Sequence, residues 1–310
     1  MNIENILVTG RIYKGIEKIL EARHLSKNLR FLEEDEVSRD DFLWADAYVS
    51  FRPTANFEFG NLKWVHSLGA GVDAYLFQRK WDDHVLLTRS VCSFGSQIGE
   101  YCLSYILRDL QCHETFQKMQ SQKRWEMVEP VSLQTQTVVV YGTGEIGQEL
   151  AKAFSLLGMM VYGVSLSGAS KSYFRQVVTV SEASDLLMQA DWVVSTLPLT
   201  SETYQLFCSS FFAKLNSAGF INVGRGATVD EPALLEALEN GRVRRAVLDV
   251  VNKEPLPDES PLWEHPNLTI TPHIAAITSP GEAVKCFMET LNKIEKNEPL
   301  LNQVDIKKGY

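Results

Sequence analysis

The sequence predicts an α/β protein built on doubly wound parallel sheets, and three observations support this fold class. Short apolar runs that suit buried strands alternate with helical stretches along the chain. One of these strands runs into a G-x-G-x-x-G turn that opens an amphipathic helix. Polar residues directly follow three later strands, and in an open parallel sheet the carboxyl ends of the strands form the ligand-binding edge.

The first part of the chain is expected to form a parallel sheet. A helical pattern covers residues 13–20, and strands are expected at residues 3–8, 45–50 and 64–68. The strands end at the segments Thr9-Gly10, Phe51-Arg52-Pro53 and Gly69-Ala70-Gly71. Glycine and proline interrupt regular structure, so each strand has a natural end.

A longer helical pattern at residues 99–119 suits a connection between two domains. Beyond it, a six-stranded doubly wound sheet is expected from strands at residues 137–140, 160–164, 192–196, 219–223, 246–250 and 268–271. From Ser279 a last apolar helical pattern can return the chain to the first domain. We therefore expect a substrate domain of residues 1–98 plus 279–310 and a dinucleotide-binding domain of residues 99–278.

Composition narrows the class of protein. The 310 residues are 45% hydrophobic and 22% charged, as in an ordinary globular chain. The net charge of −9 argues against a nucleic-acid-binding surface. No apolar run reaches the ~18 residues of a membrane span, and the first residues do not resemble a signal peptide, so we expect a cytoplasmic protein without membrane contact. The five cysteines lack C-x-x-C or metal-ligand spacing, which predicts reduced thiols and no metal site.

A glycine-rich turn, Y-G-T-G-E-I-G, follows the strand expected at residues 137–140. Gly142 permits a tight turn, Gly144 lets the backbone approach a pyrophosphate, and Gly147 lets helix and strand pack closely. The helix N-terminus then presents free N–H groups to the phosphates. The expected cofactor contacts in this turn are Gly142, Gly144, Glu145, Ile146 and Gly147. A glycine-rich connector without a ligand remains the alternative.

The second half of the chain carries residues suited to acid–base chemistry. Arg225, Asp249, Glu254 and His273 each stand at or just beyond the end of an expected strand, so they can converge on one crevice. An arginine fork matches a carboxylate, and a histidine can exchange a proton near neutral pH. A glutamate beside the histidine favours the imidazolium form and fixes the tautomer.

Together these groups can hold a 2-oxo acid and protonate its carbonyl oxygen while a nicotinamide delivers hydride. Taken singly, each has a structural alternative. Arg225 could be a surface arginine, Glu254 a loop charge, and His273 a strand-end histidine whose hydrogen bonds are already satisfied.

The sequence resembles the D-isomer-specific 2-hydroxyacid dehydrogenase family from about Ala45 to Thr278. The resemblance rests on the motifs G-A-G-V-D at residues 69–73, the G-T-G-E-I-G turn, L-P-L-T after Asp191, N-V-G-R-G, D-V-V-N-K-E-P-L and T-P-H-I-A. It implies two Rossmann-like doubly wound domains with a cleft between them, the substrate domain being flavodoxin-like. It also implies a homodimer built through the cofactor domain.

The resemblance assigns roles to individual residues. It implies that Arg225 binds the substrate carboxylate and carbonyl, that His273 exchanges the proton, and that Glu254 keeps the imidazole charged. The backbone amides of Ala70 and Gly71 are then expected to complete the carboxylate site. The further cofactor contacts that it implies are Leu197, Pro198, Thr203, Val223, Gly224 and, at the nicotinamide carboxamide, Asp249.

The residue after the second strand of the dinucleotide fold bears on cofactor choice. NAD-binding domains place Asp or Glu there, whereas this chain has Ser165. Without that carboxylate a 2′-phosphate is not repelled, and Ser165, Ser167 and Lys171 can receive it. NADP is therefore favoured over NAD. Relaxed specificity is the alternative, because Leu166 stands where NADP-preferring relatives often have arginine.

Some features have weaker interpretations. Arg52 can bind a polar or second anionic substrate tail, although a solvated loop arginine is the favoured interpretation. Ile98 can face the nicotinamide or simply pack at a helix start. The acidic run at residues 33–36 is expected to be a solvated turn. Trp125, Trp192 and Trp263 are expected to be packing anchors.

The leading functional hypothesis is an NAD(P)H-dependent reductase of a small 2-oxo acid such as glyoxylate, hydroxypyruvate or a pyruvate-like acid. A nucleotide-sensing protein, like the corepressors related to this family, is the alternative from another class. Oxidation of formate or phosphite is a third possibility, because it shares the hydride step.

Overall fold

The computed structural model describes residues 1–310, which form two compact units. Unit 1 comprises residues 1–94 and 277–310, and unit 2 comprises residues 95–276. The chain thus passes from unit 1 to unit 2 between Phe94 and Gly95 and returns between Ala276 and Ile277. The boundaries expected from the sequence, after residues 98 and 278, lie a few residues further along the chain.

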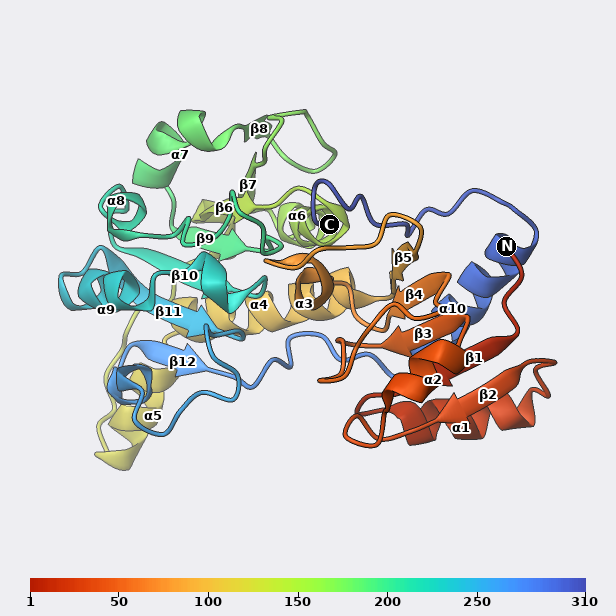
Figure 1. Ribbon diagram of the computed structural model, residues 1–310. Coiled ribbons are helices and arrows are strands. Elements are labelled where there is room, and N and C mark those ends of the chain that lie inside the picture. The colour runs from red at the N-terminus through yellow and green to blue at the C-terminus, as the bar shows by residue number, and fades with distance from the viewer. The chain divides into compact units, whose positions relative to one another are not determined.

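Unit 1 contains a five-stranded parallel sheet in the order β2-β1-β3-β4-β5 (Figure 1). The strands are β1 (Asn5–Val8), β2 (Asn28–Phe31), β3 (Ala47–Ser50), β4 (Trp64–Ser67) and β5 (Leu86–Arg89). The helices are α1 (Tyr13–Ala22), α2 (Arg39–Trp44), α3 (Asp73–Leu76) and α10 (Pro280–Glu295). The sequence patterns miss β2 and β5, which are the two edge strands. Their residues are partly exposed or polar, so neither strand forms a continuous apolar run.

The two faces of the unit 1 sheet bury separate hydrophobic clusters. On β1, Ile6 and Val8 belong to one cluster, while Leu7 between them belongs to the other. Helix α10 covers the first face, where Phe287 stacks on Trp64 with ring centroids 5.4 Å apart. The helix that returns the chain to unit 1 is therefore part of its core. It begins at the N-cap Ser279, as the sequence predicts.

Unit 2 contains a seven-stranded parallel sheet in the order β12-β11-β10-β9-β6-β7-β8 (Figure 1). The strands are β6 (Thr137–Tyr141), β7 (Met160–Val164), β8 (Gln176–Val178), β9 (Trp192–Ser195), β10 (Ala218–Asn222), β11 (Val243–Leu248) and β12 (Leu268–Ile270). The helices are α4 (Phe94–Leu110), α5 (His113–Ser121), α6 (Glu145–Leu156), α7 (Ser184–Met188), α8 (Ser209–Phe212) and α9 (Glu231–Glu239). The predicted count of six strands is one short, because β8 is a three-residue edge strand.

Short 3-10 helices complete the secondary structure: η1 (Leu133–Thr135), η2 (Val180–Glu182), η3 (Gly226–Thr228) and η4 (Pro261–Glu264). No helix combines the length and the apolar character needed to span a bilayer.

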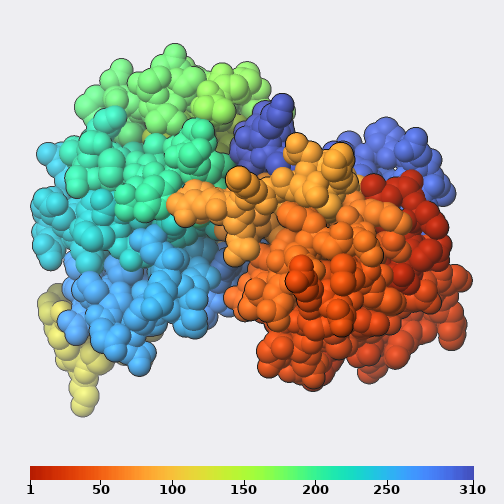
Figure 2. Space-filling view, in the orientation of Figure 1, coloured from red at the N-terminus to blue at the C-terminus, as the bar shows by residue number.

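The single helix predicted at residues 99–119 is wrong, because two helices occupy this stretch. Helix α4 ends at Leu110, and Cys112 adopts a left-handed conformation with φ of 54° before α5 starts. No residue of α5 is buried, and the loop after it leaves Trp125 101% exposed and Met127 97% exposed. Figure 2 shows this stretch, coloured yellow, standing out from the surface of unit 2. We call residues 113–131 the arm.

The expectation of three tryptophan anchors is only partly correct. Trp192 is completely buried in the sheet of unit 2. Trp263 is 53% exposed, and Trp125 has no packing within the chain. A tryptophan in a polar stretch with no apolar periodicity around it cannot be assigned to a core from its identity alone.

Candidate active site

The glycine-rich turn joins β6 to α6 and has the geometry of a phosphate-binding loop. Gly142 has φ of 97°, a conformation that favours glycine. A Cβ on Gly147 would lie 1.9 Å from the carbonyl oxygen of Gly142, so only glycine permits this helix–turn contact. A Cβ on Gly144, the N-cap of α6, would meet no atom within 4 Å. The backbone at the helix N-terminus is therefore open to a ligand, which fits a dinucleotide pyrophosphate.

The carboxyl edge of the unit 2 sheet collects the predicted site residues in an order set by strand topology. Each follows its strand directly or within a few residues. In spatial order along the edge stand His273 after β12, Asp249 after β11, Arg225 after β10, Leu197 after β9, Gly142 after β6 and Ser165 after β7. The acid–base residues thus lie toward one end of the edge, and the residue expected to select the cofactor's ribose lies toward the other.

Arg225 stands in a loop whose backbone is held from several sides. The buried Asn222 donates from Nδ2 to the carbonyl of Arg225 (3.0 Å) and accepts from the amide of Gly224 at Oδ1 (3.1 Å). Thr228 Oγ1 donates to the same carbonyl of Arg225 (2.7 Å). A Cβ on Gly226 would lie 2.0 Å from the carbonyl carbon of Val251, so the loop packs directly on the segment after β11. The guanidinium is thus projected from a rigid backbone.

Asp249 is the centre of the hydrogen bonds that hold the histidine segment. Its side chain is buried and accepts from Thr271 Oγ1 (2.6 Å), the amide of Ile274 (2.8 Å) and the amide of Ala275 (2.9 Å). Its carbonyl accepts from the amide of His273 (2.9 Å). One carboxylate and its own backbone therefore fix the turn on both sides of His273.

His273 and Glu254, predicted from the sequence as an acid–base pair, lie beside each other. His273 Nδ1 lies 2.9 Å from Glu254 Oε2, and both side chains are about half exposed. Glu254 Oε1 also accepts from the amide of Val251 (3.3 Å). Burial opposes ionisation of Glu254, but its hydrogen bond and charge interaction with His273 outweigh burial and lower its pKa. An ionised carboxylate can only accept, so Nδ1 carries the hydrogen and Nε2 is the nitrogen turned to other partners.

His273 also has a backbone conformation that non-glycine residues adopt rarely. Its φ is 55°, in the left-handed region. The four hydrogen bonds between Asp249 and the segment 271–275 hold it there. Strained backbone conformations of this kind are common at functional sites.

Tyr101 belongs to the same network, and sequence reasoning missed it. Its hydroxyl lies 2.6 Å from Thr271 Oγ1, which in turn donates to Asp249. Burial raises the pKa of Tyr101, so the phenol remains protonated. The residue sits in the long helix α4, remote in sequence from the strand ends, and no motif marks it.

The remaining predicted cofactor residues line the same edge of unit 2. Thr203 donates from Oγ1 to the carbonyl of Pro198 (2.7 Å) and accepts from the amide of Thr200 (2.8 Å), so it shapes the Leu197–Pro198 loop. Val223 is buried, and a Cβ on Gly224 would lie 2.5 Å from the carbonyl oxygen of Leu197. The ends of β9 and β10 are therefore in close contact.

The residues expected to select NADP lie after β7. Ser165 follows the last strand residue, Val164, and its hydroxyl accepts from the amide of Gly168 (3.2 Å). Ser167 and Lys171 are exposed in the same loop. No carboxylate stands at the end of this strand.

The expected substrate residues Ala70, Gly71 and Arg52 belong to unit 1, unlike all the residues above. Ser67 Oγ lies 3.2 Å from the carbonyl of Gly69 and 3.1 Å from that of Gly71, which stabilises the loop after β4. Arg52 pairs with Glu34 at 2.8 Å and has a largely exposed side chain. The acidic run at residues 33–36 therefore includes a carboxylate that binds this arginine.

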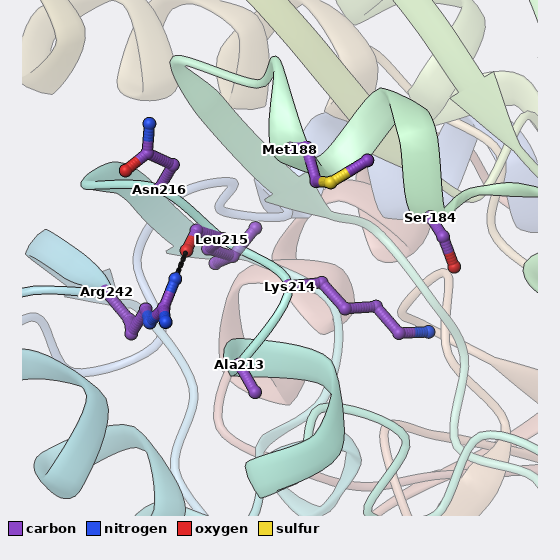
Figure 3. A pocket seen from close by; sticks show the side chains of 7 residues that line it. All are labelled: Ser184, Met188, Ala213, Lys214, Leu215, Asn216 and Arg242. Atoms are coloured by element: carbon purple, nitrogen blue, oxygen red, sulfur yellow. Dashed lines mark hydrogen bonds between the residues drawn. The ribbon is translucent and has the colours of Figure 1, made fainter.

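A separate hollow of about 460 Å³ lies on unit 2 (Figure 3). Its lining residues are Ser184, Met188, Ala213, Lys214, Leu215, Asn216 and Arg242. Arg242 directly precedes β11, and Asn216 lies just before β10, so the hollow is at the amino edge of the sheet. None of the predicted site residues lines it. No group of His, Cys, Asp or Glu side chains is arranged to hold a metal ion.

Comparison with known proteins identifies relatives of this chain. Residues 103–275 match the family model for the D-isomer specific 2-hydroxyacid dehydrogenase NAD binding domain. Glyoxylate/hydroxypyruvate reductase A of Klebsiella pneumoniae (strain 342) is 33% identical over 298 residues, covering 93% of this chain and 95% of that protein.

Two solved structures are similar over their whole length. A D-isomer specific 2-hydroxyacid dehydrogenase from Xanthobacter autotrophicus Py2, in complex with NADPH and MES, is 32% identical with a TM-score of 0.90 and covers 100% of both chains. An NADPH-dependent glyoxylate/hydroxypyruvate reductase from Sinorhizobium meliloti, in complex with NADP and sulfate, is 28% identical with a TM-score of 0.86. That match covers 99% of this chain and 100% of the other.

Proposed function

The chain belongs to the D-isomer specific 2-hydroxyacid dehydrogenase family, and we propose that it reduces glyoxylate, hydroxypyruvate or a similarly small 2-oxo acid with NADPH. It is an NAD(P)-dependent oxidoreductase of 2-hydroxy acids. The observation that carries the proposal is the His273–Glu254 pair, held at the carboxyl edge of the sheet two strands from Arg225. A sensor or corepressor gains no support from the relatives.

The roles of the three residues follow from their chemistry. Arg225 carries a permanent positive charge and a planar fork, so it binds the carboxylate and polarises the carbonyl of a 2-oxo acid. His273 donates its Nε2 proton to the carbonyl oxygen as negative charge develops there. Glu254 accepts from Nδ1, which orients the ring and stabilises its cationic form. NADPH, when bound, supplies the hydride to the carbonyl carbon.

Asp249 is proposed to position His273 as well as to contact the cofactor's carboxamide. Both of its carboxylate oxygens already accept hydrogen bonds from the segment 271–275. Each oxygen has more than one lone pair, so a further donor from the cofactor can be accommodated. Tyr101 and Thr271 extend this support to helix α4.

The substrate contacts proposed in unit 1 are the backbone amides of Ala70 and Gly71. Such amides hold an anion without a side chain, which suits a loop rich in glycine. Arg52 is the weaker candidate because its guanidinium already binds Glu34. A substrate with a second negative charge would have to compete with that carboxylate.

The preference for NADPH rests on Ser165 and on the relatives solved with this cofactor. A carboxylate after β7 would repel a 2′-phosphate, and the serine hydroxyl can instead donate to it. Ser167 and Lys171 supply further donors in the same exposed loop.

The proposed activity is tested with purified protein, NADPH or NADH, and a panel of 2-oxo acids, followed by loss of the reduced nicotinamide absorbance. We expect turnover with glyoxylate and hydroxypyruvate and a higher kcat/KM with NADPH than with NADH. Formate and phosphite, offered with NADP⁺, should give no reaction. Tight NADPH binding without turnover of any 2-oxo acid would overturn the proposal in favour of a sensor.

We further infer that two copies of the chain associate through the arm. An exposed tryptophan and methionine on a helix–loop segment with no buried residue form an apolar surface that lacks a partner within the chain. The base of the arm is anchored, because Arg245 on β11 binds Glu114 through two hydrogen bonds of 2.8 and 2.7 Å. That pairing lowers the pKa of Glu114. A fixed base and an exposed apolar tip suit a self-complementary interface.

Light scattering coupled to size-exclusion chromatography tests the dimer. The wild-type chain should have the mass of two copies, and a Trp125→Ala/Met127→Ala variant should shift toward one copy. Trp263→Ala removes a largely exposed indole outside the arm and should leave the dimer intact. A monomeric wild-type chain would contradict the inference.

We propose that the protein resides in the cytoplasm, because its five free thiols suit a reducing compartment.

A further inference from the structure

Two cysteines and a buried histidine meet in unit 1, outside the proposed site. Cys92 lies in the segment after β5, and Cys286 lies on helix α10. The amide of Val91 donates to Cys286 Sγ (3.4 Å), and Ser93 Oγ donates to Glu282 Oε1 (2.6 Å), one helical turn before Cys286. The segment 91–93 is therefore attached to α10 on both sides of Cys92. This places Cys92 beside the turn of α10 that carries Cys286, and each thiol shifts the pKa of the other.

The histidine gives the two sulfur atoms different environments. His66 is buried on β4, where Nδ1 lies 2.8 Å from Thr88 Oγ1 and Nε2 lies 3.3 Å from Ser90 Oγ. The interaction with Cys92, then those with His66 and with the Val91 amide, lower the pKa of Cys286 against the effect of burial. The interaction with Cys286, together with burial, raises the pKa of Cys92. The two shifts therefore favour ionisation of Cys286 and protonation of Cys92.

Both cysteines are partly exposed residues. Cys92 and Cys286 are each of intermediate exposure, whereas Cys102 is buried. A thiolate that is partly exposed and next to a second thiol has the properties of a redox-sensitive cysteine with its resolving partner. The proposed hydride and proton transfers use neither residue.

We propose that Cys92 and Cys286 form a reversible disulfide when the protein meets hydrogen peroxide, and that this bond slows turnover. The Cys286 thiolate attacks one peroxide oxygen, which forms an S–O bond, breaks the O–O bond and releases hydroxide that becomes water. The Cys92 sulfur then attacks the Cys286 sulfenic acid. The S–S bond forms, the S–O bond breaks, and the leaving hydroxide takes the Cys92 proton to become a second water. Two thiols are oxidised by two electrons, and the peroxide is reduced.

The effect on turnover follows from where the two cysteines stand along the chain. Cys92 directly precedes the first connection between the units, at Phe94–Gly95, and α10 follows the second, at Ala276–Ile277. A disulfide would therefore link, within unit 1, the segment that enters the first connection to the helix that follows the second. His66 also lies on the strand that leads into the loop of Ala70 and Gly71. This second half of the proposal rests on the proposed function, while disulfide formation does not.

Peptide mapping under non-reducing conditions tests the disulfide without an activity assay. The reduced full-length protein is treated with increasing hydrogen peroxide, its remaining thiols are blocked, and its peptides are identified by mass spectrometry. We expect a linked pair of peptides containing Cys92 and Cys286 that disappears with dithiothreitol. Cys92→Ser and Cys286→Ser should each abolish the link. Cys208→Ser is the matched control, because Cys208 is also partly exposed with a lowered pKa, and it should retain the link.

The wild-type map is decisive even if a serine variant folds poorly. The proposed disulfide would be overturned if both cysteines remained thiols. It would also be overturned if Cys286 were oxidised to sulfinic acid and no linked peptide formed. In parallel, peroxide should reduce turnover several-fold in the wild-type protein and in Cys208→Ser but not in the other two variants, with dithiothreitol restoring it. A linked protein that turns over as fast as the reduced one would overturn the effect on turnover alone. If no 2-oxo acid is reduced at all, the mapping still decides whether the disulfide forms.

Discussion

The two edges of the seven-stranded sheet differ in what they offer a ligand. The amino edge has a hollow of about 460 Å³, lined by Lys214, Arg242 and mainly small or apolar side chains. The carboxyl edge carries Arg225, Asp249, Glu254 and His273, with His273 Nδ1 2.9 Å from Glu254 Oε2 and a buried carboxylate that holds the histidine segment. A concave surface alone therefore does not locate chemistry in this unit. Polar groups that converge and orient one another are the better guide to where chemistry can occur.

His273→Ala should have the largest effect at the carboxyl edge. Removing the imidazole removes proton donation to the carbonyl oxygen, so kcat should fall roughly 10²–10⁴-fold. Steady-state kinetics with glyoxylate measure the change, and NADPH titration should show nearly unchanged affinity. His84→Ala, which replaces an exposed histidine of unit 1, is the control. Turnover that survived the loss of His273 would remove this residue from the mechanism.

Glu254→Gln should have a smaller effect that depends on pH. The amide keeps a polar partner for Nδ1 but carries no negative charge beside the ring, so kcat should fall and the shape of the kcat–pH profile should change. In the wild-type protein the pKa of Glu254 is below its ordinary value of 4.5. The side chain therefore stays ionised as the pH falls to 4.5 and becomes protonated only at lower pH. The kcat–pH profile measures both changes.

Glu259→Gln, in the same exposed loop, provides the matched control for this profile. Its profile should coincide with that of the wild-type protein. If Glu254→Gln also coincided with it, the pair seen at 2.9 Å would have no part in proton transfer.

Ser165→Asp should change cofactor choice more than it changes turnover. A carboxylate after β7 repels the 2′-phosphate, and the NADPH/NADH ratio of kcat/KM should fall at least roughly tenfold. Ser165→Ala removes the hydroxyl without adding charge, and it should lower the ratio much less. Equal ratios in all three proteins would mean that Ser165 does not select the cofactor.

Lys214→Ala should have the smallest effect and tests the amino edge directly. The residue lies at the surface of the hollow in Figure 3, so the free energy of unfolding should change by no more than about 0.5 kcal/mol. Thermal unfolding and steady-state kinetics should both match the wild-type protein. A clear loss of turnover would show that the edge without acid–base residues also serves the reaction.

Local patterns explain why so much of unit 2 could be predicted. A fully buried parallel strand needs a continuous apolar run, and β7 was predicted with the bounds Met160–Val164 that the structure has. The turn after β6 needs glycine at two positions, where a side chain would clash or require an unfavourable φ. Three of the four edge strands escape such reasoning because short segments that are partly exposed or polar resemble loops, as β2, β5 and β8 show, whereas the edge strand β12 was predicted.

The sequence by itself determined which groups stand at strand ends, because strand, turn and catalytic residue are consecutive in the chain. It also determined the glycines of the phosphate turn, since their requirement is local. Only the tertiary structure decided that β12, β11 and β10 are neighbours, which brings residues 273, 249 and 225 to one stretch of edge. It alone added Tyr101, placed Cys92 beside the helix that carries Cys286 and left Trp125 without a core. These contacts join segments far apart in sequence, and their geometry depends on how the sheets and helices pack rather than on any local pattern.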